Sequence, residues 1–357
     1  MAKPSAGPTA RELSPEAWAS QRAARRQRLT ALLDPTVGHG LEIGPLDRPF
    51  TSRDTDDVHY LDVRDQAGLR AYYAHDPNVV LEDIPEIDAW LVREDGTVSL
   101  SEAVAGGAPY DWVFASHVIE HVPDLVGWLR EISLVTSPGA QLALAIPDRR
   151  YCFDRLRPPT TVGQLVAAHE SGFTAPDVRA VYDHFSAHVT VRTGELHRGA
   201  RPPGRDERDY GPEWAHRTLD RVRAGEYVDA HVWLFTPSTL VEQIAELRGI
   251  GLIDWYVETL RPTSRGALEF YAVLRRVPTD GSGFDEVEPQ SDLPDWLHDE
   301  WTAADALRQA RAENRKQAKR IASLEKRIAA LESSTSWRIG QSVTRPAAAV
   351  RRRLRRG

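Results

Sequence analysis

Residues 110–147 read YDWVFASHVIEHVPDLVGWLREISLVTSPGAQLALAIP, and this run predicts the fold of the chain. Two mostly apolar stretches of strand length, residues 111–116 and 141–147, lie near its two ends. The segment between them has apolar residues at the spacing of one helix face: Leu125, Leu129, Ile132 and Val135. A strand, a helix and a second strand in succession predict a right-handed βαβ unit with parallel strands.

The same alternation continues on both sides of this unit. Five further strands are predicted, at residues 41–43, 59–63, 87–91, 252–260 and 268–274. A helix that begins at Thr236-Pro237-Ser238 precedes the last two strands, which a short Pro/Ser/Gly turn joins as antiparallel neighbours. The sequence therefore predicts an α/β fold with a seven-stranded, mostly parallel sheet whose last strand is antiparallel.

Residues 148–235 interrupt this alternation. They are rich in Arg, Pro, His and Tyr and have weak periodicity, which predicts an inserted helical lid. The predicted order is an N-terminal arm and helix at 1–35, the α/β domain with its lid at 36–277, a linker at 278–300, a coiled-coil helix at 301–332 and a basic tail at 333–357.

The 357 residues have a net charge of −7, which conceals two parts of opposite sign. Residues 308–357 carry 15 Arg or Lys and three Glu, a net charge of +12, so residues 1–307 carry −19. Such asymmetry predicts an interaction segment near the C-terminus. Residues 337–357 mix apolar and Arg side chains, which suits either an anionic membrane surface or a solvated tail. Nucleic acid is another anion that a basic tail could bind, but no other feature of the sequence indicates recognition of bases, so we expect no nucleic-acid partner.

A short heptad seam lies just before this basic tail. Its apolar residues step by three and four positions: Ile321, Leu324, Ile328 and Leu331. Only about two heptads are strongly apolar. The seam therefore predicts weak homo-oligomerisation through residues 307–331, with packing of this helix on the chain's own body as the alternative.

Cysteine content and apolar runs indicate the compartment. The single cysteine, Cys152, can form neither an intramolecular disulfide nor a thiolate zinc site by itself, which favours a reducing compartment. No apolar run approaches the about 20 residues that span a bilayer, and the N-terminus has no signal-peptide core. We therefore expect a cytoplasmic protein, with a peripheral position at the inner face of the membrane if the tail binds there.

A possible adenosine site follows from the ends of the first two predicted strands. Glu42-x-Gly44 ends the first strand, and Asp62 lies at the end of the second. A glycine lets a ligand approach the backbone at a strand end, and an acid there can accept two hydrogen bonds from a ribose diol. An ordinary turn explains a single glycine followed by an acid equally well.

The glycine pattern decides which adenosine cofactor fits. A dinucleotide site needs G-x-G-x-x-G after the strand, but here Gly44 is followed by Pro45, which has no N–H, and the other glycines are absent. No P-loop motif occurs either. These observations disfavour an NAD-dependent oxidoreductase. S-adenosylmethionine has no phosphates, and acidic side chains such as Glu42 suit its positive charges.

Several motifs together resemble the class I S-adenosylmethionine-dependent methyltransferases. The strand-end motifs lie at residues 41–44, 60–62, 110–124 and 137–147. Further segments resemble bacterial methyltransferases encoded among sugar and cell-surface polysaccharide genes, and they lie at residues 117–124, 146–154, 182–185 and 231–237. The resemblance covers about residues 38–276 and implies a Rossmann-like methyltransferase fold. Two departures are the glycine loop reduced to one glycine and Ala140 in place of a second turn glycine.

The resemblance implies a set of cofactor-binding residues. Glu42 and Gly44 would lie beside the methionine moiety, and Asp62 would hold the ribose. Asp95 resembles the acid that meets the adenine amino group, although Asp95-Gly96 is equally consistent with a simple turn. Ser116 and His117, at the end of the fourth strand, would line the methyl-donor pocket.

Methyl transfer to a hydroxyl also needs a base that takes the hydroxyl proton. His231, which lies close to Asp229 and just before the helix at 236, is the first candidate by residue type. His184 in Tyr182-Asp183-His184-Phe185 is the second. The alternative for both residues is that they are histidines packed inside the lid.

One motif could be mistaken for a metal site. His117-Val118-Ile119-Glu120-His121 matches H-x-x-E-H, an inverted zinc-protease motif. Zinc needs both histidines on one helix face and a third protein ligand, whereas His117 adjoins a strand and Pro123 soon follows His121. The sequence analysis therefore predicts no metal site.

The leading hypothesis is an S-adenosylmethionine-dependent O-methyltransferase that acts on a sugar or glycan intermediate. The alternative from another class is a methyltransferase-like scaffold without turnover, which recruits partners through its coiled coil. The sequence names neither the acceptor nor the position that is methylated, and transfer to nitrogen or carbon remains open.

Overall fold

A computed structural model of the chain describes the following residues: 26–28, 30–277, 321 and 326. The predicted linker and basic tail lie outside the described residues, as do most of the N-terminal arm and nearly all of the coiled-coil helix. The chain divides into two compact units, residues 1–298 and 299–357. Of the second unit, only Ile321 and Lys326 are described, and both are helical and exposed.

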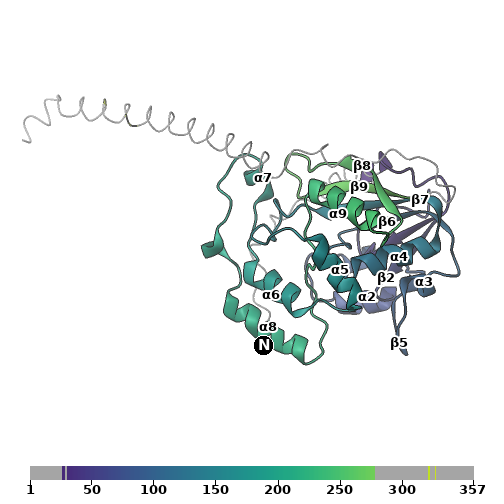
Figure 1. Cartoon of the computed structure of the whole chain (residues 1–357), viewed down its shortest axis with the longest axis horizontal. Helices are drawn as coiled ribbons and strands as arrows, with labels where there is room; N and C mark the ends of the chain where they lie inside the picture. Colours follow the sequence, from purple (N-terminus) through teal and green to yellow (C-terminus); the bar gives the residue numbers. More distant parts are fainter. Residues whose placement is uncertain (1–25, 29, 278–320, 322–325, 327–357) are drawn as a thin grey trace, which may run out of the picture. The chain divides into compact units, whose positions relative to one another are not determined.

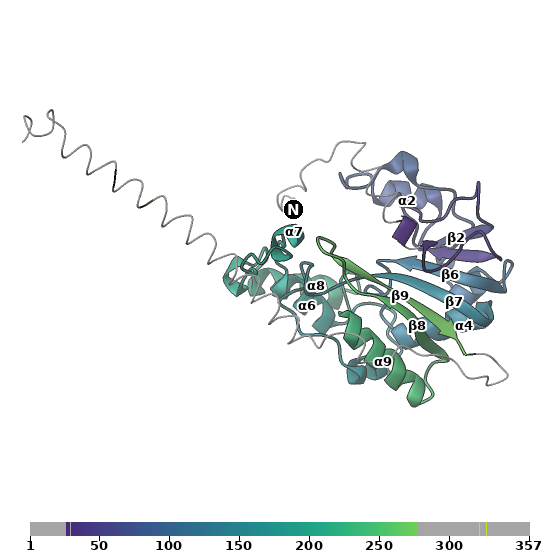
Figure 2. The ribbon, with the colours of Figure 1, turned by 90° about the horizontal axis from the view of Figure 1, so that it is seen from above.

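The first unit is built on one seven-stranded sheet (Figures 1 and 2). Its strands are β1 (Gly40–Ile43), β2 (Val58–Asp62), β3 (Ala89–Trp90), β6 (Tyr110–Ser116), β7 (Thr136–Pro147), β8 (Trp255–Arg261) and β9 (Glu269–Arg276). Their order across the sheet is β3-β2-β1-β6-β7-β9-β8. β9 runs antiparallel to both of its neighbours, and the other pairs are parallel. The predicted mostly parallel sheet with an antiparallel last strand is confirmed.

Helices and small elements connect these strands. The helices are α2 (Gln66–Tyr72), α3 (Leu100–Ala103), α4 (Leu125–Val135), α5 (Val162–Glu170), α6 (Val178–Ala187), α7 (Thr193–Leu196), α8 (Pro212–Arg223) and α9 (Pro237–Gly249). The 3-10 turns Leu81–Asp83 and Arg205–Glu207 and a hairpin of β4 (Val92–Arg93) and β5 (Gly96–Thr97) complete the set. Polar caps fix the longer helices, because Asp124 accepts a hydrogen bond from Gly127 N–H at 2.8 Å, and the Thr236 hydroxyl accepts one from Thr239 N–H.

The strands alternate between two apolar layers, as a sheet covered on both faces requires. In β6, Val113 and Ala115 pack into the layer that contains α4, α5 and α9, whereas Trp112 and Phe114 pack into the layer that contains Leu69 of α2. Figure 2 shows α2 on one face of the sheet and α4 and α9 on the other. The sheet is therefore held rigidly between helices, which fixes the positions of its strand ends.

The inserted region is helical as predicted, but its first helix belongs to the main core. α5 packs against α4 and α9, and its Leu165 and Ala168 are buried in the main apolar cluster. α6 and α8 pack mainly against each other around a small cluster that includes Val181 and Leu219. Figures 1 and 2 both show α6, α7 and α8 to one side of the sheet. The part that can act as a lid is therefore the α6–α8 segment.

One boundary differs from the sequence prediction. Ser137-Pro138-Gly139 has the composition of a turn that ends a helix, but α4 already ends at Val135 because Thr136 is extended, with φ −112° and ψ 153°. β7 therefore begins at Thr136, and its pairing with β6 shifts register between Tyr110 and Trp112. The turn residues form an irregularity inside the strand rather than a separate loop.

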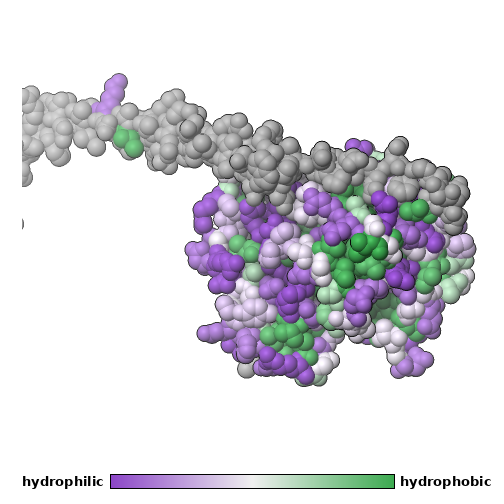
Figure 3. All heavy atoms as spheres, in the orientation of Figure 1, coloured by the Kyte–Doolittle hydropathy of each residue, from purple (hydrophilic) through white to green (hydrophobic). Residues whose placement is uncertain are grey.

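None of the helices in the described part of the chain is long and apolar enough to span a membrane. On the face drawn in Figure 3, apolar side chains form small groups among hydrophilic ones.

Candidate active site

Three strand ends meet at one edge of the sheet. β1 pairs with β2 and with β6 so that Ile43 lies opposite both Leu61 and Ala115. The residues that follow, Gly44, Asp62 and Ser116, are therefore neighbours at the carboxyl edge. The Gly44 N–H donates to the Leu61 carbonyl at 2.8 Å. This edge is where ligands bind in open α/β sheets, and the structure brings together three of the predicted site residues here.

Gly44 has a position that other residues fit poorly. Its φ is +68°, and a Cβ atom there would lie 3.0 Å from Cγ2 of Val118. A left-handed backbone favours glycine, and the close contact leaves little room for a side chain. Glycine is thus the residue type that this strand end accommodates.

Two strained residues flank the same edge. Among the described non-glycine residues, those with positive φ are Leu46, at 44°, and His117, at 54°. Leu46 follows β1 and donates its N–H to the Asp62 carboxylate, and His117 follows β6. Strained backbone conformations of this kind cluster at ligand sites because the surrounding structure must hold them in place. Their position supports a binding site at the ends of β1, β2 and β6.

Glu42 is buried beneath the loop that follows β1. Its carboxylate accepts hydrogen bonds from Phe50 N–H at 2.8 Å and Thr51 N–H at 3.0 Å, and from the Thr51 hydroxyl at 2.5 Å. Burial raises the pKa of Glu42, although these hydrogen bonds oppose the effect. Glu42 thus anchors the loop at residues 50–51, and it can act at the site by fixing that loop.

Asp62 is a half-buried acid at the end of β2. Burial raises the pKa of Asp62 to about 6, while hydrogen bonds from Val63 N–H and Leu46 N–H oppose the increase. The carboxylate therefore changes charge near neutral pH, and it gains from a ligand that donates hydrogen bonds to its ionised form.

His117 is held from the far end of the chain. Its Nε2 lies 2.8 Å from Glu269 Oε2 on β9, and its Nδ1 lies 3.4 Å from Glu120 Oε1. Glu269 also accepts from the Tyr271 hydroxyl. His117 therefore lies beside Ser116 at the end of β6, held by Glu269 and with Glu120 at the margin of contact.

Asp95 lies elsewhere in the fold. It is exposed in the turn between β4 and β5, and Figure 1 shows this hairpin projecting from the body of the domain. Gly96 follows with φ +141°. The structure thus shows a hairpin turn at Asp95 and does not group this residue with Gly44, Asp62 and Ser116.

His231 forms a buried dyad with an acid. Its Nδ1 lies 2.5 Å from Asp154 Oδ2, and Asp154 Oδ1 accepts a hydrogen bond from Arg157 Nη1 at 2.7 Å. Burial acts to raise the pKa of Asp154, but His231 and Arg157 outweigh it and hold that pKa well below its usual range. With the proton of a neutral ring on Nδ1, facing the ionised acid, the lone pair of His231 would be on Nε2. A histidine oriented by an acid in this way can accept a proton.

His184 supports this dyad rather than duplicating it. Burial lowers the pKa of His184 to about 3, so the ring is neutral at ordinary pH. Its Nδ1 accepts a hydrogen bond from the His231 backbone N–H at 3.1 Å, which leaves the ring proton on Nε2. In this arrangement His184 positions the backbone of His231, and it has no free lone pair with which to act as a base.

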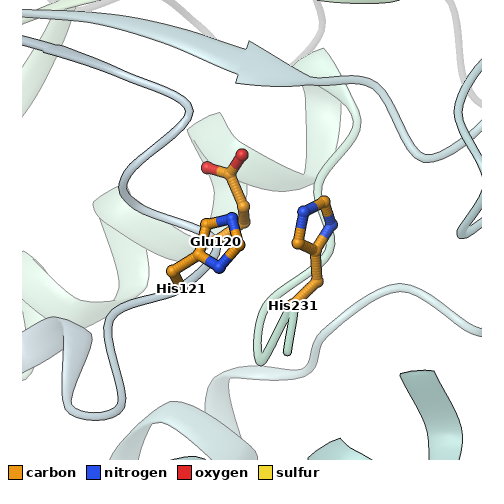
Figure 4. Close-up of side chains that lie close together, drawn as sticks. All are labelled: Glu120, His121 and His231. Carbon is orange, nitrogen blue, oxygen red and sulfur yellow. The ribbon is translucent and has the colours of Figure 1, made fainter. Parts of the chain in front are cut away.

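Two neighbouring residues complete the group around His231 (Figure 4). Glu120 and His121 follow β6 and face the His231 ring, and one potential ligand atom from each residue lies within 4.8 Å of the others. The rings of His121 and His231 are T-shaped at 4.6 Å between centroids. The Nδ1 atom of His121 lies 2.8 Å from Asp229 Oδ1.

The group around His231 adjoins the strand-end edge. His117 contacts Glu120 and follows Ser116 directly. Burial raises the pKa of Tyr73 to about 12, and the charges of Asp62 and Asp229 both contribute. Tyr73 therefore lies within electrostatic reach of the second strand end and of the acid beside His121. The two groups of residues are therefore adjacent in the fold.

Asp154, Glu120 and Glu269 are site residues that the sequence analysis did not select. Asp154 and Glu269 lie 77 and 152 residues from their histidine partners, so local spacing gives no signal for either contact. Glu120 and His121 were visible in the H-x-x-E-H motif, but that motif pairs them with His117 rather than with His231.

The sheet order and the site at its carboxyl edge define a class I S-adenosylmethionine-dependent methyltransferase. A family model described as a methyltransferase domain matches residues 17–249, and the chain belongs to this family. S-adenosylmethionine, the predicted cofactor, is the methyl donor of this class of enzyme. No curated protein matches the chain significantly.

Solved structures with similar topology include several methyltransferases. An S-adenosylmethionine-dependent methyltransferase from Mesorhizobium loti is 15% identical, covers 70% of this chain and 96% of its own, and has a TM-score of 0.34. The CcbJ methyltransferase from Streptomyces caelestis is 11% identical, with coverages of 72% and 96% and a TM-score of 0.37. A complex of DhpI with SAH is 17% identical, with coverages of 73% and 85% and a TM-score of 0.34.

Proposed function

We propose that the protein transfers the methyl group of S-adenosylmethionine to a hydroxyl of a sugar or glycan intermediate. The observation that supports this proposal is the adjacency of two groups of polar residues. The strand-end edge of Gly44, Asp62 and Ser116 lies next to the group that contains the His231–Asp154 dyad, through the contact of His117 with Glu120. An inactive scaffold would need none of the polar groups that converge on His231, so it is not favoured.

The cofactor contacts follow the strand ends. Asp62 accepts hydrogen bonds from the two ribose hydroxyls, and the open backbone of Gly44 lies beside the methionine moiety, with Glu42 anchoring the loop next to it. Ser116 and His117 line the pocket around the methyl group. Asp95 remains a proposed adenine contact, although it lies in an exposed turn.

The reaction at the acceptor is an in-line displacement. The acceptor oxygen forms a bond to the methyl carbon, the carbon–sulfur bond breaks, and S-adenosylhomocysteine leaves with the bonding electron pair. The hydroxyl proton passes to Nε2 of His231, and the Asp154 carboxylate stabilises the imidazolium that results. The protein contributes alignment of the two reactants and this proton transfer.

Tyrosine rings near the site suit a carbohydrate acceptor. The side chains of Tyr72 and Tyr227 are 63% and 56% exposed. Burial of part of the Tyr227 side chain raises its pKa to about 12, and the charges of Asp229 and Tyr72 add to this, so these groups lie near one another. Exposed aromatic rings with hydroxyl groups can stack on a sugar and donate hydrogen bonds to it. The segment before His231 is thus proposed to contact the acceptor.

Association with other partners is proposed from the sequence alone. Residues 307–331 would form a weak homo-oligomer, and residues 337–357 would contact an anionic membrane surface at the inner face of the membrane. Apart from Ile321 and Lys326, these segments lie outside the described residues.

Cofactor binding provides the first test of this proposal. Calorimetry with S-adenosylhomocysteine should give one site per chain, and Asp62→Ala should weaken binding at least about 100-fold because two hydrogen bonds to a charged group are lost. Asp54→Ala, which removes an exposed acid and the same charge, should bind as the wild type does. No binding by the wild type would sink the cofactor assignment, and unchanged binding by Asp62→Ala would sink the role of that residue.

The pH dependence of this affinity is a separate prediction. Because the pKa of Asp62 is raised to about 6, the carboxylate is mostly protonated at pH 5 and cannot offer its charge to the ribose. The affinity for S-adenosylhomocysteine should therefore be about tenfold lower at pH 5 than at pH 7 and level off above pH 7. Calorimetry at both pH values measures this change. The ratio should disappear in Asp62→Asn, and a wild type without any such ratio would contradict the prediction.

The acceptor can be found by a transfer assay. Methyl-labelled S-adenosylmethionine should label one or more nucleotide sugars or lipid-linked glycans, and the label should resist mild alkali as a methyl ether does. Labelling of proteins or small amines but of no carbohydrate would refute the proposed acceptor class while leaving the methyltransferase activity in place.

A further inference from the structure

Glu120 is a buried acid without a hydrogen-bonding partner. The residue is 1% exposed, and neither carboxylate oxygen has a hydrogen-bond partner among the described residues. Nδ1 of His117, at 3.4 Å, is an ion-pair contact at the margin of that distance. Burying a carboxylate is costly unless charges and hydrogen bonds compensate for it. The proposed methyl transfer gives this side chain no task.

Two histidines face the same carboxylate from different parts of the chain. His121 follows Glu120 directly, and His231 comes from the segment before α9 (Figure 4). The Glu120 carbonyl accepts hydrogen bonds from Val232 N–H at 2.6 Å and from Trp233 N–H at 3.2 Å, which fixes the two segments side by side. One ligand atom from each of the three side chains lies within 4.8 Å of the other two.

Each histidine also has an acid on its outer side. Nδ1 of His231 is 2.5 Å from Asp154 Oδ2, and Nδ1 of His121 is 2.8 Å from Asp229 Oδ1. Metal-binding histidines commonly donate the proton of their other ring nitrogen to a carboxylate in this way, which fixes the tautomer and the ring orientation. Both rings are therefore left with Nε2 as the nitrogen that can bind an ion.

We propose that Glu120, His121 and His231 bind one divalent first-row transition-metal ion. Two imidazoles and one carboxylate form a ligand set that zinc and iron(II) accept, and it leaves coordination positions open for a water or a substrate oxygen. Tetrahedral ligands bound at about 2.1 Å lie about 3.4 Å apart. A closure of up to about 1.4 Å from the observed limit of 4.8 Å, by rotation of the side chains, therefore completes the site.

The ion would give the buried acid its missing partner. Its two positive charges compensate Glu120 and face the outer acids Asp154 and Asp229 through the imidazole rings. The site differs from the H-x-x-E-H arrangement of the sequence, because His117 is turned toward Glu269 and His231 takes its place. The sequence predicted no metal site because His117 adjoins a strand and Pro123 soon follows His121, and His231 is distant from this motif in the chain.

A role in catalysis follows if the proposed function holds. An acceptor hydroxyl bound to the ion would lose its proton more easily, since a metal lowers the pKa of a bound water by several units. Nε2 of His231 would then be a ligand, and the proton would leave the hydroxyl for solvent. In this case His231 would act directly as a base only in the metal-free protein.

Metal binding can be measured without any activity assay. The full chain, freed of metal with a chelator and carrying no histidine tag, should bind one Zn²⁺ per chain by calorimetry, and Zn²⁺ should raise its thermal midpoint. Glu120→Gln keeps the shape of the side chain and should lose at least about tenfold in affinity, as should His121→Asn. His216→Ala, which removes an exposed histidine outside the group, should bind as the wild type does.

The outcomes separate this inference from the proposed function. If the wild type binds no Zn²⁺ at stoichiometric concentration, or if Glu120→Gln and His121→Asn bind it equally well, the metal site is refuted. If Zn²⁺ binds as expected but no carbohydrate is methylated, the site stands and the proposed acceptor fails. A third outcome is that the protein binds no Zn²⁺ and that a chelator does not affect methyl transfer. This outcome overturns the metal site and leaves His231 as the base.

Discussion

Replacing His231 by glutamine is expected to slow methyl transfer by about 10²–10⁴-fold, the range typical for loss of a positioned acid–base group. Glutamine still offers an N–H toward Asp154 but has no ring nitrogen that can take a proton or bind an ion. The affinity for S-adenosylhomocysteine should stay within about twofold of the wild type, because the proposed cofactor contacts lie at the strand ends. Steady-state rates with the identified acceptor, together with calorimetry, measure both quantities.

The control for this change is an exposed histidine. His216→Gln, on α8, should leave the rate and the cofactor affinity unchanged. A loss of less than about tenfold in His231→Gln would remove His231 from the chemistry. Equal losses of cofactor affinity and rate would show instead that the variant disturbs the whole site.

A second large effect is expected from the buried ion pair beneath His231. Asp154→Ala should lower the free energy of unfolding by about 3–5 kcal/mol, because it leaves a buried guanidinium without its acid. The side chains of Asp154 and Arg157 are 1% and 2% exposed, and Nη2 of Arg157 also donates to the His231 carbonyl at 2.9 Å. Urea denaturation followed by circular dichroism measures this change.

Two variants show whether the charge is the cause. The double variant Asp154→Ala/Arg157→Met removes both charges and should recover part of the loss, because an apolar pair can replace a buried ion pair. Asp209→Ala breaks the more exposed pair with His188 and should cost about 1 kcal/mol or less. If Asp154→Ala costs no more than Asp209→Ala, the buried pair does not stabilise the fold.

The sheet could be predicted because its signals are local. Apolar stretches such as residues 112–115 are buried on both faces, so they stand out as continuous runs, and the helix after them repeats its apolar residues at helical spacing. The predicted and observed element boundaries differ where a boundary depends on the pairing of distant strands. β7 starts at Thr136 because pairing with Tyr110 extends it through a turn that looked like a helix end.

The edge proposed to bind the cofactor could be predicted for the same reason. Gly44, Asp62, Ser116 and His117 occupy positions just at or after strand ends, and parallel strands place those positions together automatically. Asp95 has no such constraint, because the chain after β3 forms a hairpin of its own. Residue type and position after a strand therefore predict a site residue only where the strand belongs to the main sheet.

The environment of His231 could not be predicted from spacing. Its acid, Asp154, comes from the other end of the inserted region, and its neighbours Glu120 and His121 come from the loop after β6. Backbone hydrogen bonds from Val232 and Trp233 to the Glu120 carbonyl set this arrangement, and no residue pattern in the sequence predicts them. The motif around Glu120 could be recognised, but its third member could be identified only in three dimensions.

The small separate core of α6 and α8 makes the inserted region a replaceable module. Its Val181 and Leu219 pack against each other rather than against the sheet, whereas the segment from Val232 onward is tied to the loop after β6. Exchanging the stretch between α5 and residue 228 would therefore alter the proposed acceptor side, including the contact of His184 with the His231 backbone, and leave the strand-end edge assembled. For enzyme engineering, the domain offers a fixed methyl-donating half on which different acceptor-binding halves can be grafted.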